Sequence, residues 1–226
     1  MKISILSLFP EMFSVFNSSL IKRATDKNLL QINCIDIRDY SQDKHQKCDD
    51  YTFGGGAGMI MMPQPIHDAI MACDPLHNAH RIYMSPKGRT LNQKTVMELS
   101  KYEEILLLCG HYEGVDQRVI DLDIDEEISI GDYVLTGGEI PAMALVDAVS
   151  RYVDGVLGSS HSTEEESFSA GTLEYPQYTR PQVFMGISVP EVLINGNHQL
   201  VDKWRTEQSD KVTREKRPDL LVDNNK

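Results

Sequence analysis

The residues best placed to do chemistry lie in one stretch of the sequence, Cys109–Pro141. Within it, Gly110-His-Tyr-Glu-Gly114 directly follows the apolar run Ile105–Cys109, so glycine-framed polar side chains stand at the end of an expected buried strand. Ligands of parallel α/β sheets gather at the carboxyl ends of strands. We therefore expect a binding site here, in which His111 is either a base or an ordinary hydrogen-bonded histidine.

The second half of this stretch, Glu127–Pro141, is an apolar strand broken by three glycines, Gly131, Gly137 and Gly138. An ordinary strand does not need such interruptions unless its backbone bends sharply or approaches something closely. Backbone N–H and C=O groups in such a loop can recognise an adenine edge, and Ile130 and Leu135 can line a flat apolar slot.

Two other loops are ambiguous when each is taken alone. Gly54-Gly-Gly-Ala-Gly58 is neither a GxGxxG fingerprint after a strand nor a phosphate-binding Walker loop, because no Lys follows it. A surface loop is the simpler interpretation, and a binding loop is the alternative. Tyr83–Gly88 is either a ligand loop at a strand end or a plain strand-to-helix turn.

The later part of the chain carries charged and aromatic groups. Arg180 has Tyr175 and Tyr178 as neighbours, a composition that binds phosphate and stacks on bases, or that forms a turn packed on a core. Lys211–Pro218 holds several cations, so it is either a phosphate-binding strip or a solvated helix end.

These segments need a framework of alternating strands and helices to position them. Short β-branched runs predict strands at Lys2–Leu8, Gln31–Ile37, Arg81–Met84, Glu104–Cys109 and Glu127–Ile130. Amphipathic stretches predict helices at Glu11–Thr25, Gln64–Ala72, Asn92–Lys101, Asp116–Leu122 and Ala142–Tyr152. Strands separated by helices predict an α/β domain with a mostly parallel sheet, covered on both faces.

The texture of the sequence changes after Leu157. The polar, acidic segment that follows has no periodicity and is typical of a flexible linker, and a helix is predicted around Gly196–Asp210. We therefore expect an α/β domain over residues 1–157, a linker over 158–165, and a small, mainly helical C-terminal domain over 166–226.

Composition limits the possible functions. The net charge of −12 argues against a protein that coats nucleic acid non-specifically, which needs clustered Lys and Arg. No apolar run is long enough for a membrane helix. The four cysteines have no metal-ligand spacing and no export signal precedes them, so we expect reduced thiols in a cytoplasmic protein. A dinucleotide-dependent oxidoreductase is excluded, because Phe9-Pro10-Glu11 stands where its glycine fingerprint should follow the first strand.

Taken in order, the segments resemble the bacterial tRNA (guanine-N1)-methyltransferases of the SPOUT superfamily. The resemblance covers nearly the whole chain and rests on Ile5–Phe13, Asp49-Asp50, Gly54–Met59, Tyr83–Pro86, Cys109–Gly114, Ser129–Glu139 and Tyr175–Pro181. It implies a deep trefoil knot in the large domain, which general folding rules would not have suggested. It also implies an obligate homodimer with shared active sites, S-adenosylmethionine as methyl donor, and tRNA guanine 37 as target, with magnesium left open and no metal ligands assigned.

The resemblance assigns roles residue by residue. Glu113 matches a site acid and Arg151 a catalytic arginine, while Gly55, Gly56, Gly58 and Arg180 match positions that bind the RNA. The expected donor-binding residues are Tyr83, Met84, Ser85, Pro86, Gly110, Ile130, Gly131, Asp132, Tyr133, Val134, Leu135, Gly138 and Pro141.

The chain departs from the family at the general base. An aspartate is expected immediately before Ser167-Phe168, and this chain has Glu166 there. We expect Glu166 to be the base, with Glu165 as second choice and a linker glutamate without a role as the remaining alternative. A non-catalytic RNA-binding module, or a related methyltransferase with another RNA site, also stays open.

Overall fold

The computed structural model describes residues 1–158 and 166–221, and the chain divides into two compact units after Gly158. Each unit is considered separately. Apart from Gly158, the expected linker lies outside the described residues.

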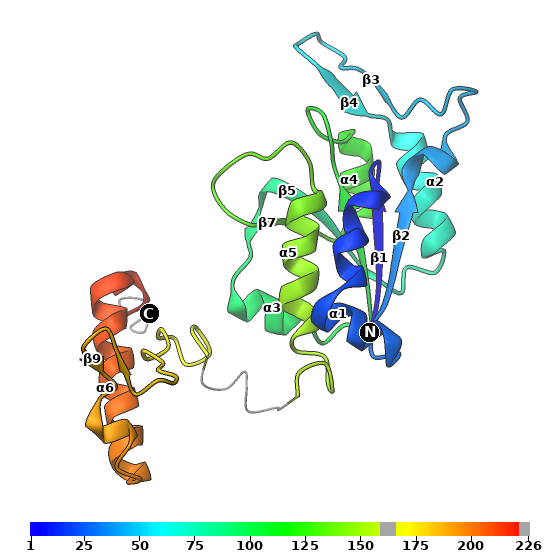
Figure 1. Cartoon of the computed structure of the whole chain (residues 1–226). Helices are drawn as coiled ribbons and strands as arrows, with labels where there is room; N and C mark the ends of the chain where they lie inside the picture. Colours follow the sequence, from blue (N-terminus) through cyan, green and yellow to red (C-terminus); the bar gives the residue numbers. More distant parts are fainter. Residues whose placement is uncertain (159–165, 222–226) are drawn as a thin grey trace. The chain divides into compact units, whose positions relative to one another are not determined.

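The first unit is built on a five-stranded sheet with the order β2-β1-β6-β5-β7 (Figure 1). The strands are β2 (Gln31–Asp36), β1 (Lys2–Ser7), β6 (Glu104–Cys109), β5 (His80–Thr90) and β7 (Glu126–Ser129). All neighbouring strands in this sheet run parallel. The prediction of an α/β domain with a mostly parallel sheet is therefore confirmed, and each of the five predicted strands is present.

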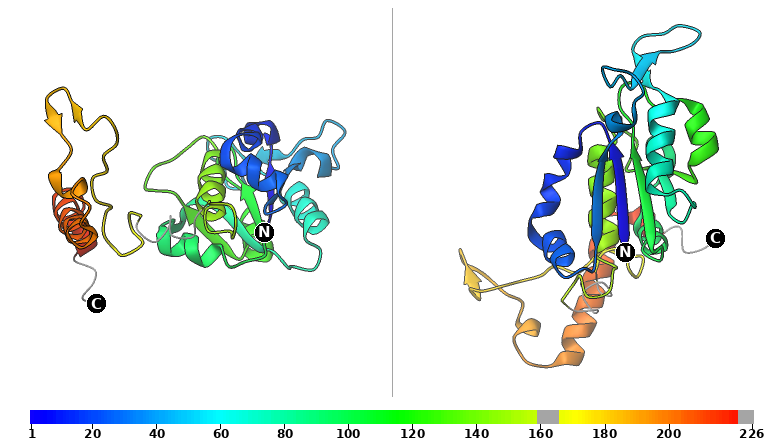
Figure 2. Two further views of the ribbon diagram at one scale, coloured as in Figure 1. Left: turned by 60° about the horizontal axis from the view of Figure 1, so that its bottom comes forward. Right: turned by 90° about the vertical axis from the view of Figure 1, so that its right-hand side faces the viewer.

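Helices cover both faces of the sheet, as the continuously apolar strands require (Figure 2). On one face, α1 (Ser19–Asp26), α3 (Gln93–Leu99) and α5 (Glu139–Ser150) contribute to one hydrophobic core. On the other, α2 (Pro63–Cys73) and α4 (Gln117–Asp123) contribute to a second. None of the helices in the described part of the chain is long and apolar enough to cross a membrane.

The helix predicted over Glu11–Thr25 is divided in two. A 3-10 helix, η1 (Pro10–Asn17), ends at Ser18, whose backbone is extended, and α1 begins at Ser19 with a φ of 55°. A right-handed helix cannot pass through a residue with positive φ, so the chain turns between the two segments. A second 3-10 segment, η2 (Ile37–Tyr40), follows β2.

Two strand features differ from the sequence prediction. β5 continues past the predicted Met84 to Thr90, with a register shift between Met84 and Arg89 that bends the strand at its carboxyl end. A separate antiparallel ribbon, β3 (Asp49–Tyr51) with β4 (Met59–Met61), was not predicted. It projects beyond the carboxyl ends of β1 and β2 (Figure 1).

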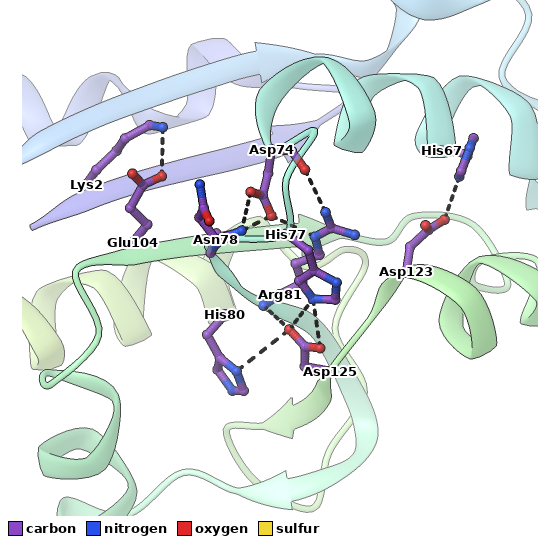
Figure 3. Close-up of polar contacts among 11 residues, drawn as sticks. Lys2, His67, Asp74, His77, Asn78, His80, Arg81, Glu104, Asp123 and Asp125 are labelled. Atoms are coloured by element: carbon purple, nitrogen blue, oxygen red, sulfur yellow. Dashed lines mark hydrogen bonds and ion pairs between the residues drawn. The ribbon is translucent and has the colours of Figure 1, made fainter.

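A buried polar cluster fixes the opposite edge of the sheet (Figure 3). Arg81 Nε donates to Asp74 Oδ2 at 2.8 Å, and both side chains are almost fully buried. The backbone N–H of Arg81 donates to Asp125 Oδ2 at 2.8 Å, and His77 Nε2 lies 3.0 Å from Asp125 Oδ1. These contacts join the end of α2, the start of β5 and the turn between α4 and β7.

In the second unit, one long helix, α6 (His198–Lys216), packs against the turn-rich segment 166–175. Thr213 is fully buried, and its hydroxyl accepts from the Leu173 backbone N–H at 2.9 Å. Ser209 Oγ donates to the Leu173 carbonyl at 2.6 Å. The remaining elements are short: β8 (Val183–Phe184), β9 (Ile187–Ser188), η4 (Glu191–Leu193) and η5 (Pro218–Leu221).

Candidate functional site

A cavity of about 230 Å³ lies at the carboxyl ends of β5, β6 and β7. This is the edge at which parallel sheets bind ligands. The expected donor-binding residues that line it are Tyr83, Met84, Ser85, Pro86, Gly110, Ile130, Gly131, Tyr133, Val134, Leu135, Gly138 and Pro141. Asp132 is the one expected donor residue that does not line it.

Glycines let two distant loops meet at the wall of this pocket. The Gly138 N–H donates to the Gly110 carbonyl at 2.8 Å, and His111 and Gly137 form an isolated antiparallel bridge. A Cβ on Gly138 would lie 2.8 Å from Cys109 Cα, and one on Gly110 would lie 2.6 Å from the Tyr83 hydroxyl. Any larger side chain would therefore push the loops apart, which is why glycine occupies both positions.

The loop after β7 forms the open edge of the pocket. Ser129 Oγ donates to the Gly131 carbonyl at 3.0 Å, and Gly131 has a φ of 151°. Tyr133, Val134 and Leu135 follow with exposed fractions of 56%, 83% and 38%. Apolar side chains this exposed beside a pocket are available to a flat ligand.

Two ionisable groups, Tyr83 in the pocket lining and Cys109 behind it, have raised pKa values. Burial, together with the nearby Glu127 and Cys109, raises the pKa of Tyr83 to about 12. Burial also raises the pKa of the Cys109 thiol well above its ordinary value. A thiol without thiolate character is a poor nucleophile. Cys109 is also fully buried and does not line the cavity, so its thiol is not available to a ligand there.

Sequence reasoning missed a buried polar group beside the pocket. Glu139 is only 2% exposed, and its Oε1 accepts from Ser7 Oγ at 2.7 Å. Its Oε2 lies 3.6 Å from His111 Nδ1, an atom that is buried and makes no hydrogen bond to the described residues. The His111 ring lines the cavity and packs at a tilt against Phe9, with ring centroids 4.8 Å apart. His111 is therefore a packed, half-buried histidine.

Glu113 joins the pocket to the glycine-rich loop. Glu113 lines the cavity, and its backbone N–H donates to the Met59 carbonyl at 3.0 Å. A Cβ on Gly58 would lie 2.5 Å from Glu113 Cγ, so the end of the loop packs directly on this acid. Gly55 and Gly56 lie in the exposed part of the same loop, both with positive φ.

Besides Asp132 and the glycines of the 54–58 loop, Arg151, Glu166 and Arg180 are expected site residues that do not line this pocket. Arg151 caps the end of α5, about 18 Å along the helix from Glu139 at about 1.5 Å per residue. Glu166 and Arg180 belong to the second unit. Arg151 and Glu166 both take part in interactions within the chain. Glu165, the second candidate for the base, lies outside the described residues.

Glu166 lines a second cavity, of about 450 Å³, within its own unit. Its other walls include Tyr175 and Arg205, and the Arg205 guanidinium carbon lies 4.9 Å from the centroid of the Tyr175 ring. The expected basic strip lies at the end of α6, where Arg217 pairs with Asp219 at 2.7 Å. Arg180 is exposed.

The remaining chemical features of the described residues are limited. All four cysteines are free thiols in the structure. Over residues 1–158 and 166–221, no group of three or more His, Cys, Asp or Glu side chains is arranged to hold a metal ion.

Comparison with known proteins gives a match along almost the whole chain. A family model described as "tRNA (Guanine-1)-methyltransferase TrmD" matches residues 1–223. A tRNA (guanine-N(1)-)-methyltransferase of Alkaliphilus metalliredigens is 55% identical over 226 residues, covering 98% of this chain and 92% of that protein. One from Clostridium botulinum is 56% identical over 221 residues, with the same coverage. One from Clostridioides difficile is 51% identical over 229 residues, covering 100% of this chain and 99% of that protein.

Proposed function

The chain belongs to the tRNA (guanine-1)-methyltransferase family, and from that membership we propose its reaction and the roles of its residues. The enzyme transfers a methyl group from S-adenosylmethionine to N1 of a tRNA guanine. The target is guanine 37, immediately 3′ to the anticodon, and the enzyme works in the cytoplasm. The observation that carries the proposal is the glycine-walled pocket at the carboxyl ends of β5, β6 and β7, formed by the residues expected to bind the donor.

The pocket fits the methyl donor. The close packing of Gly110 and Gly138 brings two loops together as one wall of the pocket, and Ile130 and Leu135 offer an apolar slot for an adenine ring. S-adenosylmethionine, when bound, supplies an activated methyl group on a sulfonium. The absence of a reactive thiolate at Cys109 is consistent with direct transfer.

The protein must make guanine N1 nucleophilic. N1 carries a proton at neutral pH, so a general base has to remove it as the N1–CH₃ bond forms, while negative charge develops on O6. We assign the base to Glu166, whose carboxylate takes the N1 proton, and the stabilisation of O6 to the Arg151 guanidinium. A general base of this kind contributes about 10²–10⁴-fold to the rate.

We propose a homodimer with shared sites because Arg151 lies away from the donor pocket of its own chain. Within one chain, Arg151 lies about 15 Å along α5 from Pro141 in the pocket lining, too far for its side chain to reach the transferred methyl. A second subunit that packs against α5 in the opposite direction brings its own Arg151, and the Glu166 that follows it, to this pocket. The close crossing of the Cys109–His111 and Gly137–Gly138 segments supports the trefoil knot that the family implies.

Mixed dimers test the shared site. Subunits carrying Gly138→Ala, which damages the donor pocket, are denatured and refolded together with subunits carrying Arg151→Ala. If sites are shared, each mixed dimer contains one site without either substitution, and random pairing restores about a quarter of the wild-type activity. Activity no higher than that of the two variants separately would show that each site is built from one chain.

The target is tested with unmodified tRNA transcripts and labelled donor. A transcript with guanine at position 37 should accept label, and the same transcript with adenine at position 37 should not. Equal labelling of both transcripts would place the methylated nucleotide elsewhere in the RNA.

A further inference from the structure

The tip of the β3–β4 ribbon exposes large aromatic side chains to solvent. Phe53 is 101% exposed and Tyr51 is 77% exposed, although aromatic residues usually bury most of their surface. Gly54 and Gly55 follow with φ of 85° and 82°, and nothing would lie within 4 Å of a Cβ added at either position. Phe53 thus contributes no packing within the first unit, and the neighbouring backbone is bare.

This ribbon is fixed to the donor pocket. The Met61 N–H donates to the Gly114 carbonyl at 2.9 Å, and the Glu113 N–H donates to the Met59 carbonyl at 3.0 Å. Gly58, at the end of the loop, packs on the Glu113 side chain. Because Glu113 and Gly114 line the pocket, the ribbon that carries the aromatic tip is attached directly to residues of the site.

The chemistry of the tip favours a base over a phosphate. Asp49 and Asp50 stand at the start of the ribbon, and the chain as a whole carries a net charge of −12. Phosphate binding needs clustered cations, which this segment lacks. An exposed benzyl ring beside bare backbone offers instead a flat π face, which any nucleobase can stack on irrespective of its sequence.

The proposed reaction leaves one nucleobase of the tRNA without a stacking neighbour. Guanine N1 lies on the Watson–Crick edge, and enzymes that modify a base in this way take it out of its stack. The nucleotide next to the target then loses one stacking neighbour. We propose that Phe53 stacks on a nucleobase adjacent to the target guanine and replaces that neighbour while the guanine occupies the site. Phe53 is thus a positioning residue for the RNA, and this role rests on the proposed function.

Substitution of Phe53 in the full-length protein tests the proposal. Phe53→Ala should raise the KM for tRNA roughly 5- to 150-fold, the range expected for one stacked base. The KM for the donor and the melting temperature should stay at the wild-type values, because Phe53 is outside the donor pocket and the core. Phe53→Tyr and Phe53→Trp should restore the tRNA KM, whereas Phe53→Leu, which is apolar without a π system, should not. Leu76→Ala, which removes another apolar side chain that is 77% exposed, is the matched control.

Three results would overturn the stacking role. The first is a wild-type tRNA KM for Phe53→Ala, and the second is a Phe53→Leu protein as active as Phe53→Tyr. The third is a lower assembly mass of Phe53→Ala by light scattering, which would show that a second subunit covers the ring. A wild-type enzyme that fails to methylate any tRNA would contradict the proposed function itself, so the two failures are distinguishable.

Discussion

Replacement of Gly138 with Ala tests whether donor binding needs the close packing of the pocket wall at this position. The added Cβ would lie 2.8 Å from Cys109 Cα and 3.0 Å from the Gly110 nitrogen. An ordinary carbon contact begins near 3.4 Å, so the two loops must separate by about 0.6 Å in a tightly packed wall. Both neighbours are backbone atoms, which cannot rotate away. Gly138 has a φ of −81°, so the alanine adds no backbone strain and the effect is purely steric.

The expected cost follows from overpacking, which is typically about 1–3 kcal/mol. If this cost is lost from donor binding, Gly138→Ala should weaken the donor Kd about 5- to 150-fold, as measured by isothermal titration calorimetry. The melting temperature of a unit of this size should fall by roughly 2–12 °C. Gly158→Ala is the matched control, because no atom lies within 4 Å of its added Cβ and it should bind donor as the wild type does. Unchanged donor affinity in Gly138→Ala would refute the assignment of the Gly110–Gly138 wall to the donor pocket.

Three further predictions concern the base and the framework. Glu166→Gln should slow single-turnover methylation about 10²–10⁴-fold at unchanged donor affinity, while the control Glu174→Gln should not; a near-normal rate for Glu166→Gln would remove it as the base. Partial burial alone would raise the pKa of Asp125, but hydrogen bonds from the Arg81 backbone and from His77 hold it below its ordinary value of 3.8. The stability that ionised Asp125 contributes is present above pH 3.8 and is lost as pH falls through its lower folded-state pKa. The difference in melting temperature between wild type and Asp125→Asn should therefore shrink below about pH 4. A difference that stays constant with pH would contradict this. Asp74→Ala leaves Arg81 buried without its carboxylate partner and should destabilise the protein by about 3–5 kcal/mol in urea unfolding, and a loss under about 1 kcal/mol would show that the pair is not important.

The sequence was sufficient for the framework of the first unit because its strands are continuous apolar runs. Ile105–Cys109 could only be a buried strand, and the polar turn after it had to lie at the carboxyl edge of the sheet. The β3–β4 ribbon was missed because Asp49–Tyr51 is short, half polar and without alternation, and its pairing depends on contacts with the Gly110–Gly114 turn. The break between η1 and α1 was missed because a positive φ at Ser19 leaves no mark in the periodicity.

The glycines of the site stand out in the sequence, but the sequence does not show why glycine is required at each position. Gly138 is required because it meets Gly110, 28 positions earlier, and no local pattern indicates that approach. The same holds for Glu139, whose hydroxyl donor Ser7 lies 132 positions away. Both contacts join segments that are far apart in the sequence, so periodicity and local motifs cannot predict them.

The central claim is that the chain methylates guanine at N1. The most direct measurement is mass spectrometry of nucleosides from unmodified tRNA digested after incubation with the purified enzyme and S-adenosylmethionine. The account predicts 1-methylguanosine as the new methylated nucleoside. Its absence, or the appearance of a 2′-O-methylated or N2-methylated nucleoside in its place, would contradict the account.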